Sequence, residues 1–194
     1  VSCYGFSDGQ ASISTVGGSS NIYTYYWSTS QTTIDTDFDM HDSLAYGSYY
    51  VTTRDDLGCE VVDTVFISEP EPLSMEAMEV DWIDCYNDAT GEGTAIAAGG
   101  TAPYVFDWVN GSATWVSDQG DTITTLTKGE HTVVVTDLRG CTASDTVVIH
   151  NPDSLYINII DSLTVYPYCM GVNTASLSAV ATGGTGMYWY EWND

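Results

Sequence analysis

Basic residues are nearly absent from this 194-residue sequence, which has 3 Lys and Arg residues against 27 Asp and Glu residues and a formal net charge of -24. Phosphate backbones and anionic membrane surfaces repel a chain of this charge, so we expect neither nucleic acid nor lipid headgroups as direct partners. The sequence has no run of 18 apolar residues, and it does not open with a basic segment followed by an apolar one. We therefore expect no membrane insertion, and we expect any export signal to lie outside these residues.

Catalytic motifs are also missing. The sequence has no Gly-x-Ser-x-Gly elbow and no His-Glu-x-x-His pair, and its one Lys and two Arg residues cannot build a phosphate cradle. An acid and base pair of carboxylates needs a concave site, which narrow β-sandwiches with short turns rarely provide. We expect a protein that is not an enzyme and that has no resident cofactor.

The sequence does have what a packed core needs, because 43% of its residues are hydrophobic and 12% are aromatic. This content argues against disorder in spite of the high charge. Short alternating runs rich in Val, Ile, Thr and aromatic residues are separated by Gly, Asp and Asn, and no period of 3.6 residues is sustained. The pattern predicts an all-β fold made of sandwich domains.

The sequence also repeats itself, with a period of about 82 residues. Cys3 and Cys85 are 82 positions apart, Cys59 and Cys141 are 82 apart, and Cys169 follows Cys85 by 84. A Gly-Gly pair and then a Trp follow each opening cysteine at nearly constant spacing, namely Gly17-Gly18 and Trp27, Gly99-Gly100 and Trp108, and Gly183-Gly184 and Trp192. A period of this size indicates small tandem domains.

We divide the chain into three tandem immunoglobulin-like β-sandwich domains of about 82 residues per repeat. They are residues 1–70, a repeat whose first strand is missing, residues 71–152, a complete repeat, and residues 153–194, the N-terminal part of a truncated third repeat. Joints at Glu69-Pro70 and Asn151-Pro152 separate them, and Leu73 to Val80 supplies the extra opening strand of the second repeat. We expect both ends of the sequence to be interior cuts in a longer array.

Aromatic residues mark the clearest strand of each repeat. They occupy every second position at Tyr104, Phe106 and Trp108, at Tyr23, Tyr25 and Trp27, and at Tyr188, Tyr190 and Trp192. Alternate residues of a strand share one face, so we expect this face to be buried in all three repeats.

Each complete repeat holds two cysteines that are 56 residues apart. We therefore expect one structural disulfide per domain, Cys3 with Cys59 and Cys85 with Cys141, and a partner for Cys169 outside these residues. Closing such a loop stabilises a domain by roughly 4 kcal/mol on the chain-entropy model, and bonds of this kind form in oxidising compartments. A metal–thiolate site is the alternative, but the sequence has no Cys-x-x-Cys pair and no paired His.

From Cys85 to Pro152, Gly-Gly precedes Pro-Tyr-x-Phe-x-Trp, and Gly-x-x-x-Val-x-Val-x-Asp-x-x-Gly-Cys then leads to a closing Pro. This pattern resembles the SprB-type repeat of giant Bacteroidota cell-surface adhesins. The first repeat departs from it in having no counterpart of Pro103, and the third has Met170-Gly171 after its cysteine. The resemblance implies type IX secretion and display on the bacterial outer surface, in some members as a mobile adhesin of gliding motility.

We therefore predict non-catalytic stalk or filament repeats of a large secreted cell-surface adhesin, located extracellularly on the bacterial outer surface. The alternatives are spacer modules of a secreted multidomain hydrolase, or repeats that themselves bind glycans. The expected partners are neighbouring repeats of the same chain, together with surface glycans or a motility or secretion complex.

The O-glycosylation pattern of the same lineage, Asp followed by Ser or Thr and then an apolar residue, makes the chain a candidate glycoprotein. It occurs at Ser43, Thr64, Thr122, Thr146, Ser154 and Ser162. Asp-Thr-Val is also a common way for a strand to begin after a turn, which accounts equally well for Thr64 and Thr146. Ser154 and Ser162, near the second joint, are the stronger candidates.

Two groups of residues suggest further ligands. Calcium at the joints, bound by Asp81 and Asp84 with Asp55 or Asp56, is an alternative to a solvated acidic surface. The alternating Asp35, Asp37 and Asp39 do not form an EF-hand, because the loop lacks the required Gly and Glu. Some aromatic residues do not fall in the alternating pattern that marks the core. They could stack on sugar rings or pack between domains, and they are Tyr26, Trp82, Trp115 and Trp189.

Overall fold

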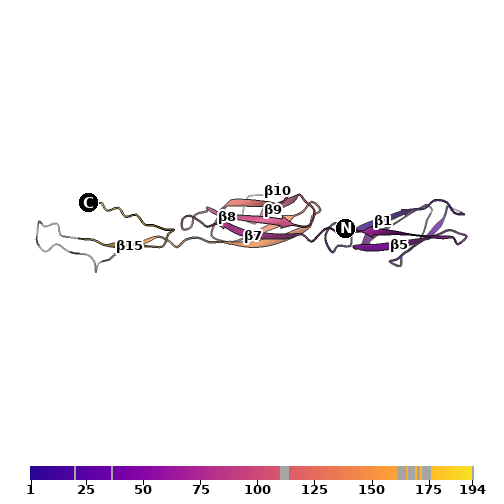
Figure 1. Ribbon diagram of the computed structural model, residues 1–194, viewed down its shortest axis with the longest axis horizontal. Helices are drawn as coiled ribbons and strands as arrows, with labels where there is room; N and C mark the ends of the chain where they lie inside the picture. Colours follow the sequence, from indigo (N-terminus) through magenta and orange to yellow (C-terminus); the bar gives the residue numbers. More distant parts are fainter. Residues whose placement is uncertain are drawn as a thin grey trace.

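A computed structural model describes residues 1–19, 21–35, 37–109, 114–160, 165, 169, 171 and 176–193, and for residues 114–116 it describes the backbone alone. Within these residues every named element is a β-strand, so the predicted all-β class is confirmed. No helix in the described part of the chain is long and apolar enough to cross a membrane. Two sandwiches and a hairpin follow one another end to end along the long axis (Figure 1).

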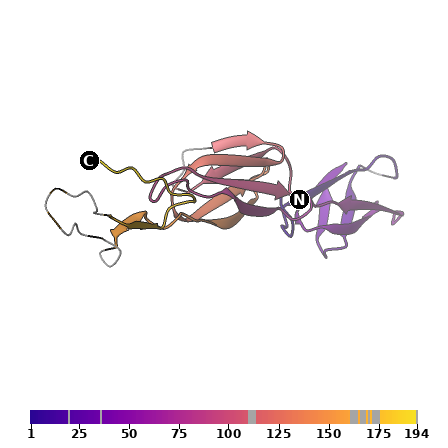
Figure 2. The same cartoon turned by 60° about the vertical axis from the view of Figure 1, so that its left-hand side comes forward.

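The second repeat is a complete sandwich of seven strands. Its strands are β7 (Ser74–Asp81), β8 (Gly91–Ala98), β9 (Tyr104–Trp108), β10 (Thr114–Ser117), β11 (Gly120–Leu126), β12 (Gly129–Thr136) and β13 (Thr142–Ile149). One sheet has the order β11-β8-β7 and the other has the order β10-β9-β12-β13, with every pair antiparallel. The two sheets form the layers of an immunoglobulin-like sandwich (Figure 2).

The core of the second repeat lies between these sheets. Tyr104, Phe106 and Trp108 of β9 are all buried, as their alternation predicts. The indole Nε1 of Trp108 donates to Asp121 Oδ2 at 3.0 Å, which satisfies the one polar atom of this side chain.

The first repeat has the same plan with one strand fewer. Its strands are β1 (Gly9–Ser14), β2 (Tyr23–Trp27), β3 (Thr32–Asp35), β4 (Phe38–Leu44), β5 (Gly47–Arg54) and β6 (Glu60–Ile67). The pair β1-β4 faces a sheet of order β3-β2-β5-β6. Tyr23, Tyr25 and Trp27 are buried, as predicted, and Trp27 Nε1 donates to Asp39 Oδ2 at 2.7 Å. No strand equivalent to β7 precedes β1 among the described residues.

Equivalent glycines bring β8 close to β13 in the second repeat and β1 close to β6 in the first. A Cβ atom on Gly91 of β8 would lie 2.5 Å from Cγ2 of Ile149, and one on Gly9 of β1 would lie 2.6 Å from Cγ2 of Ile67. Both distances are far below van der Waals contact, so glycine is required at this position in each repeat.

The third repeat contributes a hairpin in which β14 (Tyr156–Ile159) pairs with β15 (Ala179–Thr182). These strands take the places of β7 and β8. Tyr188, Tyr190 and Trp192 lie outside any strand and are 41%, 45% and 51% exposed, so the prediction that they form a buried strand face is wrong. The physical reason is that β9 is held between β10 and β12 in the second repeat, whereas no equivalent of either strand is found beside these residues in the described part of the chain.

Candidate functional site: the joint between repeats

A disulfide bond joins the first repeat to the second. Cys3 is bonded to Cys141 across 138 positions of sequence, with the two Cα atoms 5.7 Å apart. Cys59, Cys85 and Cys169 are free and exposed. The predicted pairs, Cys3 with Cys59 and Cys85 with Cys141, are therefore wrong, and the observed bond links two domains instead of closing a loop within each.

The path of the chain through each sandwich explains this correction. Five strands, β1 to β5, separate Cys3 from Cys59, and five strands, β8 to β12, separate Cys85 from Cys141. Each antiparallel strand carries the chain to the opposite end of the sandwich, so an odd number of strands leaves the two cysteines at opposite ends. The constant spacing of 56 residues shows that two positions recur in each repeat, and it does not make them neighbours.

Cys3 lies at the end of the first repeat where the chain leaves for the second. The backbone nitrogen of Val1 donates to the Ser68 carbonyl at 2.7 Å, and that of Gly5 donates to Glu69 Oε2 at 2.9 Å. These hydrogen bonds hold the segment that contains Cys3 against the start of the linker.

The end of the linker is held by a Gly-Gly turn of the second repeat. Gly99 and Gly100 have φ angles of +75° and +60°. The Gly100 N–H donates to the Glu71 carbonyl at 2.8 Å, and a Cβ on Gly99 would lie 2.0 Å from the Pro72 oxygen. The backbone approach is therefore too close for any residue with a side chain. The Tyr104 hydroxyl donates to the Gly99 carbonyl at 2.6 Å and fixes the turn to the core strand β9.

Asp137 builds the turn that presents Cys141, which we call the cysteine turn (residues 137–141). Its buried carboxylate accepts N–H groups of Thr101, Arg139 and Cys141 at 2.8 to 2.9 Å. One side chain thus ties the cysteine turn to the Gly-Gly turn, since Thr101 directly follows Gly100. Arg139 completes the joint by donating from Nη1 to the Val1 carbonyl at 2.8 Å.

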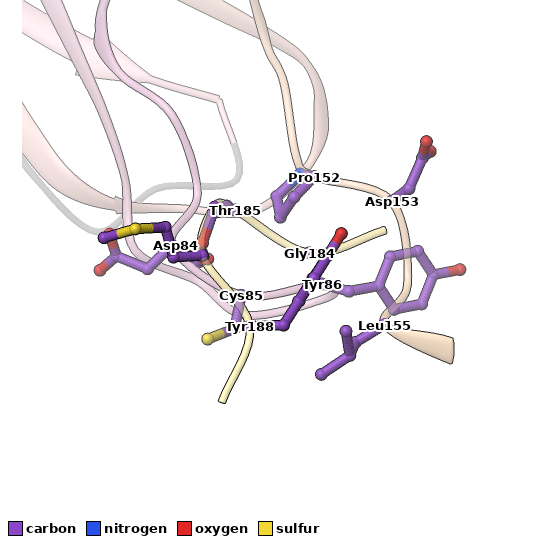
Figure 3. Close-up of a pocket in the computed structure, with 11 residues that line it drawn as sticks. Asp84, Cys85, Tyr86, Pro152, Asp153, Leu155, Gly184, Thr185 and Tyr188 are labelled. Atoms are coloured by element: carbon purple, nitrogen blue, oxygen red, sulfur yellow. Dashed lines mark hydrogen bonds between the residues drawn. The ribbon is translucent and has the colours of Figure 1, made fainter. Parts of the chain in front are cut away.

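The second joint, between the second and third repeats, contains an open cavity of about 280 Å³. Figure 3 shows Cys85 among the residues that line this cavity, together with Pro152 of the linker and Gly184 of the third repeat. Thr185 Oγ1 donates to the Asp84 carbonyl at 3.5 Å, so the two repeats are in contact here.

The carboxylates considered for calcium do not converge. Among the described residues, no group of three or more His, Cys, Asp or Glu side chains is arranged to hold a metal ion. Asp55 instead builds the turn before Cys59, and the Cys59 N–H, with Ser19 and Leu57, holds the pKa of this carboxyl below its usual value. Asp84 lines the cavity of the second joint, at the far end of a different repeat.

Five of the six O-glycosylation candidates lie in the described part of the chain, and Ser162 lies outside it. Ser43, Thr64, Thr122 and Thr146 are exposed on strands, and Ser154 is half-buried in the second linker. The Asp of the pattern has structural partners at several sites: Asp121 accepts from Trp108, and Asp145 accepts the Ala77 N–H at 2.9 Å. The pattern therefore has a structural explanation there, and modification of the hydroxyls stays a prediction.

The exposed aromatic residues belong to different repeats. Tyr26 of the first repeat is 40% exposed, Trp82 of the second is 60% exposed and Trp189 of the third is 93% exposed. Trp82 packs beside the His150 ring, with ring centroids 5.7 Å apart. The side chain of Trp115 lies outside the described residues.

Solved structures resemble this chain weakly. The C-terminal 282-residue fragment of intimin, in complex with the intimin-binding domain of the translocated intimin receptor, is 19% identical with a TM-score of 0.39, and the similarity covers 77% of this chain and 60% of the fragment. The amphioxus IgVJ-C2 molecule is 13% identical with a TM-score of 0.33, covering 74% and 97%. The N-terminal eight Ig domains of Down syndrome cell adhesion molecule are 12% identical with a TM-score of 0.32, covering 92% and 30%.

Comparison with protein families gives a match that recurs with the period of the repeat. No curated protein matches the chain. The model of the SprB repeat matches residues 1–32, 83–113 and 165–194, just under half of the chain, and successive matches begin 82 residues apart. Each match contains one of the opening cysteines Cys3, Cys85 and Cys169. The chain thus carries three matches to the SprB repeat at the spacing of its own repeats, consistent with repeats of the SprB type.

Proposed function

We propose that this chain is a non-catalytic stalk segment of a large secreted adhesin on a bacterial outer surface, in the manner of the gliding adhesins that carry SprB repeats. The observation that carries this proposal is the Cys3–Cys141 bond. A covalent link between successive sandwiches is of use to a protein that must hold its domains in line, and it has no evident use in an isolated binding domain.

The geometry of the first joint supports a stiff connection. Six linker residues, 68–73, separate β6 from β7. Within this length the linker is held at Ser68 and Glu69 by the first repeat and at Glu71 by the second. The two sandwiches therefore have little freedom to bend at the joint, which suits a stalk that projects a distal binding surface.

The chemistry of the chain supports an extracellular location. A structural disulfide persists in an oxidising environment and is rare in the cytosol. The net charge of -24 keeps neighbouring stalks apart by mutual repulsion and keeps an exposed filament soluble. We propose exposed Ser43, Thr64, Thr122 and Thr146, together with Ser154 and Ser162, as sites of O-glycosylation on this surface.

Surface labelling of cells that express the natural protein tests the proposal. Antibodies raised against the oxidised chain are expected to label intact cells, and brief treatment with an external protease is expected to remove the label. Cells that lack the gene are expected to attach poorly to a surface or to lose gliding. Labelling that requires permeabilised cells would reject the surface location, and loss of a secreted hydrolase activity with normal attachment would favour a spacer role.

A further inference from the structure

We propose that every joint of the array is closed by a disulfide in one fixed register, in which the opening cysteine of a repeat bonds to the closing cysteine of the next repeat. The opening cysteines are Cys3, Cys85 and Cys169, and the closing cysteines are Cys59 and Cys141. Cys3–Cys141 is one bond of this series. Cys85 would form a second bond, with the closing cysteine of the third repeat, and Cys59 would form another, with the opening cysteine of a preceding repeat. The proposal rests on joint geometry and is independent of the adhesin role.

The turn that contains Cys85 has the same backbone hydrogen bond and conformation as the turn that contains Cys3. The Asp88 N–H donates to the Cys85 carbonyl at 3.0 Å, as the Phe6 N–H donates to the Cys3 carbonyl at 3.1 Å. Within each turn the second residue after the cysteine has positive φ, +65° at Asn87 and +76° at Gly5. Asn87 is not a glycine, and it still adopts the left-handed conformation of Gly5, so the two turns share one backbone conformation.

The segment before Cys85 also has the bonds of its counterpart. The Ile83 N–H donates to the His150 carbonyl at 3.1 Å, where Val1 donates to Ser68 in the first repeat. The Asp84 N–H donates to Thr90 Oγ1 at 3.0 Å, where that of Ser2 donates to Asp8 Oδ1 at 2.9 Å. The bond of Ile83 therefore holds the segment before Cys85 against the outgoing linker, as the bond of Val1 does before Cys3.

The third repeat has a Gly-Gly turn at the second joint that is equivalent to the one of the second repeat at the first joint. The Gly184 N–H donates to the Asp153 carbonyl at 2.8 Å, and the Tyr188 hydroxyl donates to the Gly183 carbonyl at 2.6 Å. A Cβ on Gly183 would lie 2.1 Å from the Ser154 oxygen, the counterpart of the contact between Gly99 and Pro72. The incoming linker is thus held by an equivalent Gly-Gly turn.

The two joints differ in the element that fills the space beside the opening cysteine. At the first joint this element is the cysteine turn, residues 137–141, whose Cys141 reaches Cys3. At the second joint the corresponding space is the cavity of about 280 Å³ lined by Cys85, Tyr86 and Gly184 (Figure 3). The occupant that fits is the Asp-x-x-Gly-Cys turn of a completed third repeat.

Cys59 lies at the end of the first repeat that is opposite to Cys3, in a turn equivalent to the cysteine turn of the second repeat. Asp55 accepts the N–H groups of Leu57 and Cys59 at 3.1 and 2.8 Å, and Gly58 has φ of +89°, close to the +87° of Gly140. The thiol of Cys59 is exposed beside a cavity of about 130 Å³ that the Gly17-Gly18 turn also lines. By the same register, this turn receives the linker and the opening cysteine of a preceding repeat.

Each bond forms by exchange with a disulfide supplied from outside, either a thiol oxidoreductase or a small-molecule disulfide. The thiolate of one cysteine attacks that disulfide, forms a mixed disulfide and releases one thiol. The thiolate of the second cysteine then attacks the mixed disulfide and releases the other. The cysteine pair loses two protons and two electrons, and the external disulfide is reduced to two thiols.

An inserted repeat tests the register within the full chain. A second copy of residues 71–152 is placed between Pro152 and Asp153, with Tyr86→Phe and Thr142→Ser in the copy so that mass spectrometry distinguishes its cysteine peptides. The chain is refolded with oxidised and reduced glutathione, alkylated and mapped without reduction. We expect Cys3 bonded to Cys141 and Cys85 bonded to the Cys141 of the copy, with Cys59, Cys169 and the Cys85 of the copy alkylated.

The same peptide map contains its own folding control, because the Cys3–Cys141 bond reports that the first joint has formed. The matched variant carries Cys141→Ser in the copy alone, and it is expected to leave Cys85 alkylated and Cys3–Cys141 intact. Alkylated Cys85 in the unmutated insertion chain, or a bond between Cys85 and Cys141 of one repeat, would overturn the proposal. Surface labelling could still succeed in that event, so the two proposals fail separately.

Discussion

Asp145 of β13 accepts the backbone N–H of Ala77 in β7 at 2.9 Å. These strands belong to different sheets of the second sandwich, so the bond closes one edge of the domain. In the first repeat the equivalent Asp63 accepts the N–H of Thr64, and a small cavity of about 40 Å³ lies beside it where an opening strand would pass. The opening strand therefore completes the sandwich, and Asp145 ties it to the opposite sheet.

Replacing Asp145 with Ala is expected to loosen β7. The Ala77 N–H loses its acceptor, which costs about 1 kcal/mol for a partly exposed group. Amide exchange over residues 74–81 and urea unfolding followed by tryptophan fluorescence measure the effect. Asp63→Ala is the matched control, because Asp63 makes the same bond to the following Thr but has no strand to hold. Equal losses from the two variants would contradict the assignment.

Stability is expected to fall in acid partly through Asp145. The N–H of Ala77, and then that of Thr146, hold the pKa of this carboxyl below its usual value. The contribution is therefore complete above the ordinary Asp pKa of about 3.9 and is lost as pH falls through the lower folded pKa. Asp145→Asn should unfold with a shallower pH dependence below about pH 4. Ser144→Ala, an exposed neighbour, should keep the original slope.

Gly91→Ala is expected to destabilise the second repeat by about 1 to 3 kcal/mol, because the new methyl overlaps Ile149. Gly9→Ala should have a similar effect on the first repeat through Ile67. Thermal unfolding measures both. The double variant Gly91→Ala with Ile149→Ala should lose less stability than the two single variants lose together, since the side chain that the new methyl overlaps has been removed. Full additivity would mean that the clash lies elsewhere.

Cys141→Ser is expected to free the joint without unfolding either sandwich. Small-angle X-ray scattering should show a broader distribution of end-to-end distances than for the oxidised chain. The denatured state also gains freedom when a loop of 138 residues opens, so unfolding should become easier by up to roughly 5 kcal/mol on the chain-entropy model. Cys59→Ser, which removes a free thiol, is the control and should change neither property. A Cys141→Ser chain as straight as the oxidised one would assign the alignment to the linker alone.

Local patterns of the sequence predicted the strands of the first two repeats and did not predict the disulfide. The alternation from Tyr104 to Trp108 predicts a buried strand face correctly, because the two-residue period belongs to one strand. The same alternation fails at Tyr188 to Trp192, where burial depends on neighbouring strands. The pairing of Cys3 depends on which end of the sandwich each cysteine occupies. Counting the strands between Cys3 and Cys59 reveals that signal, and the spacing of 56 residues does not.

The Cys3–Cys141 bond also determines how the chain carries tension. A pull along the array passes through the sulfur atoms, so the chain between these cysteines, whose sequence separation is 138, does not lengthen while the bond is intact, even if both sandwiches melt. In the proposed register, the load next follows the backbone from Cys141 to Cys169, 28 positions further on, and crosses another bond. The reach of such a tether under load is set by covalent bonds and not by the stability of its domains.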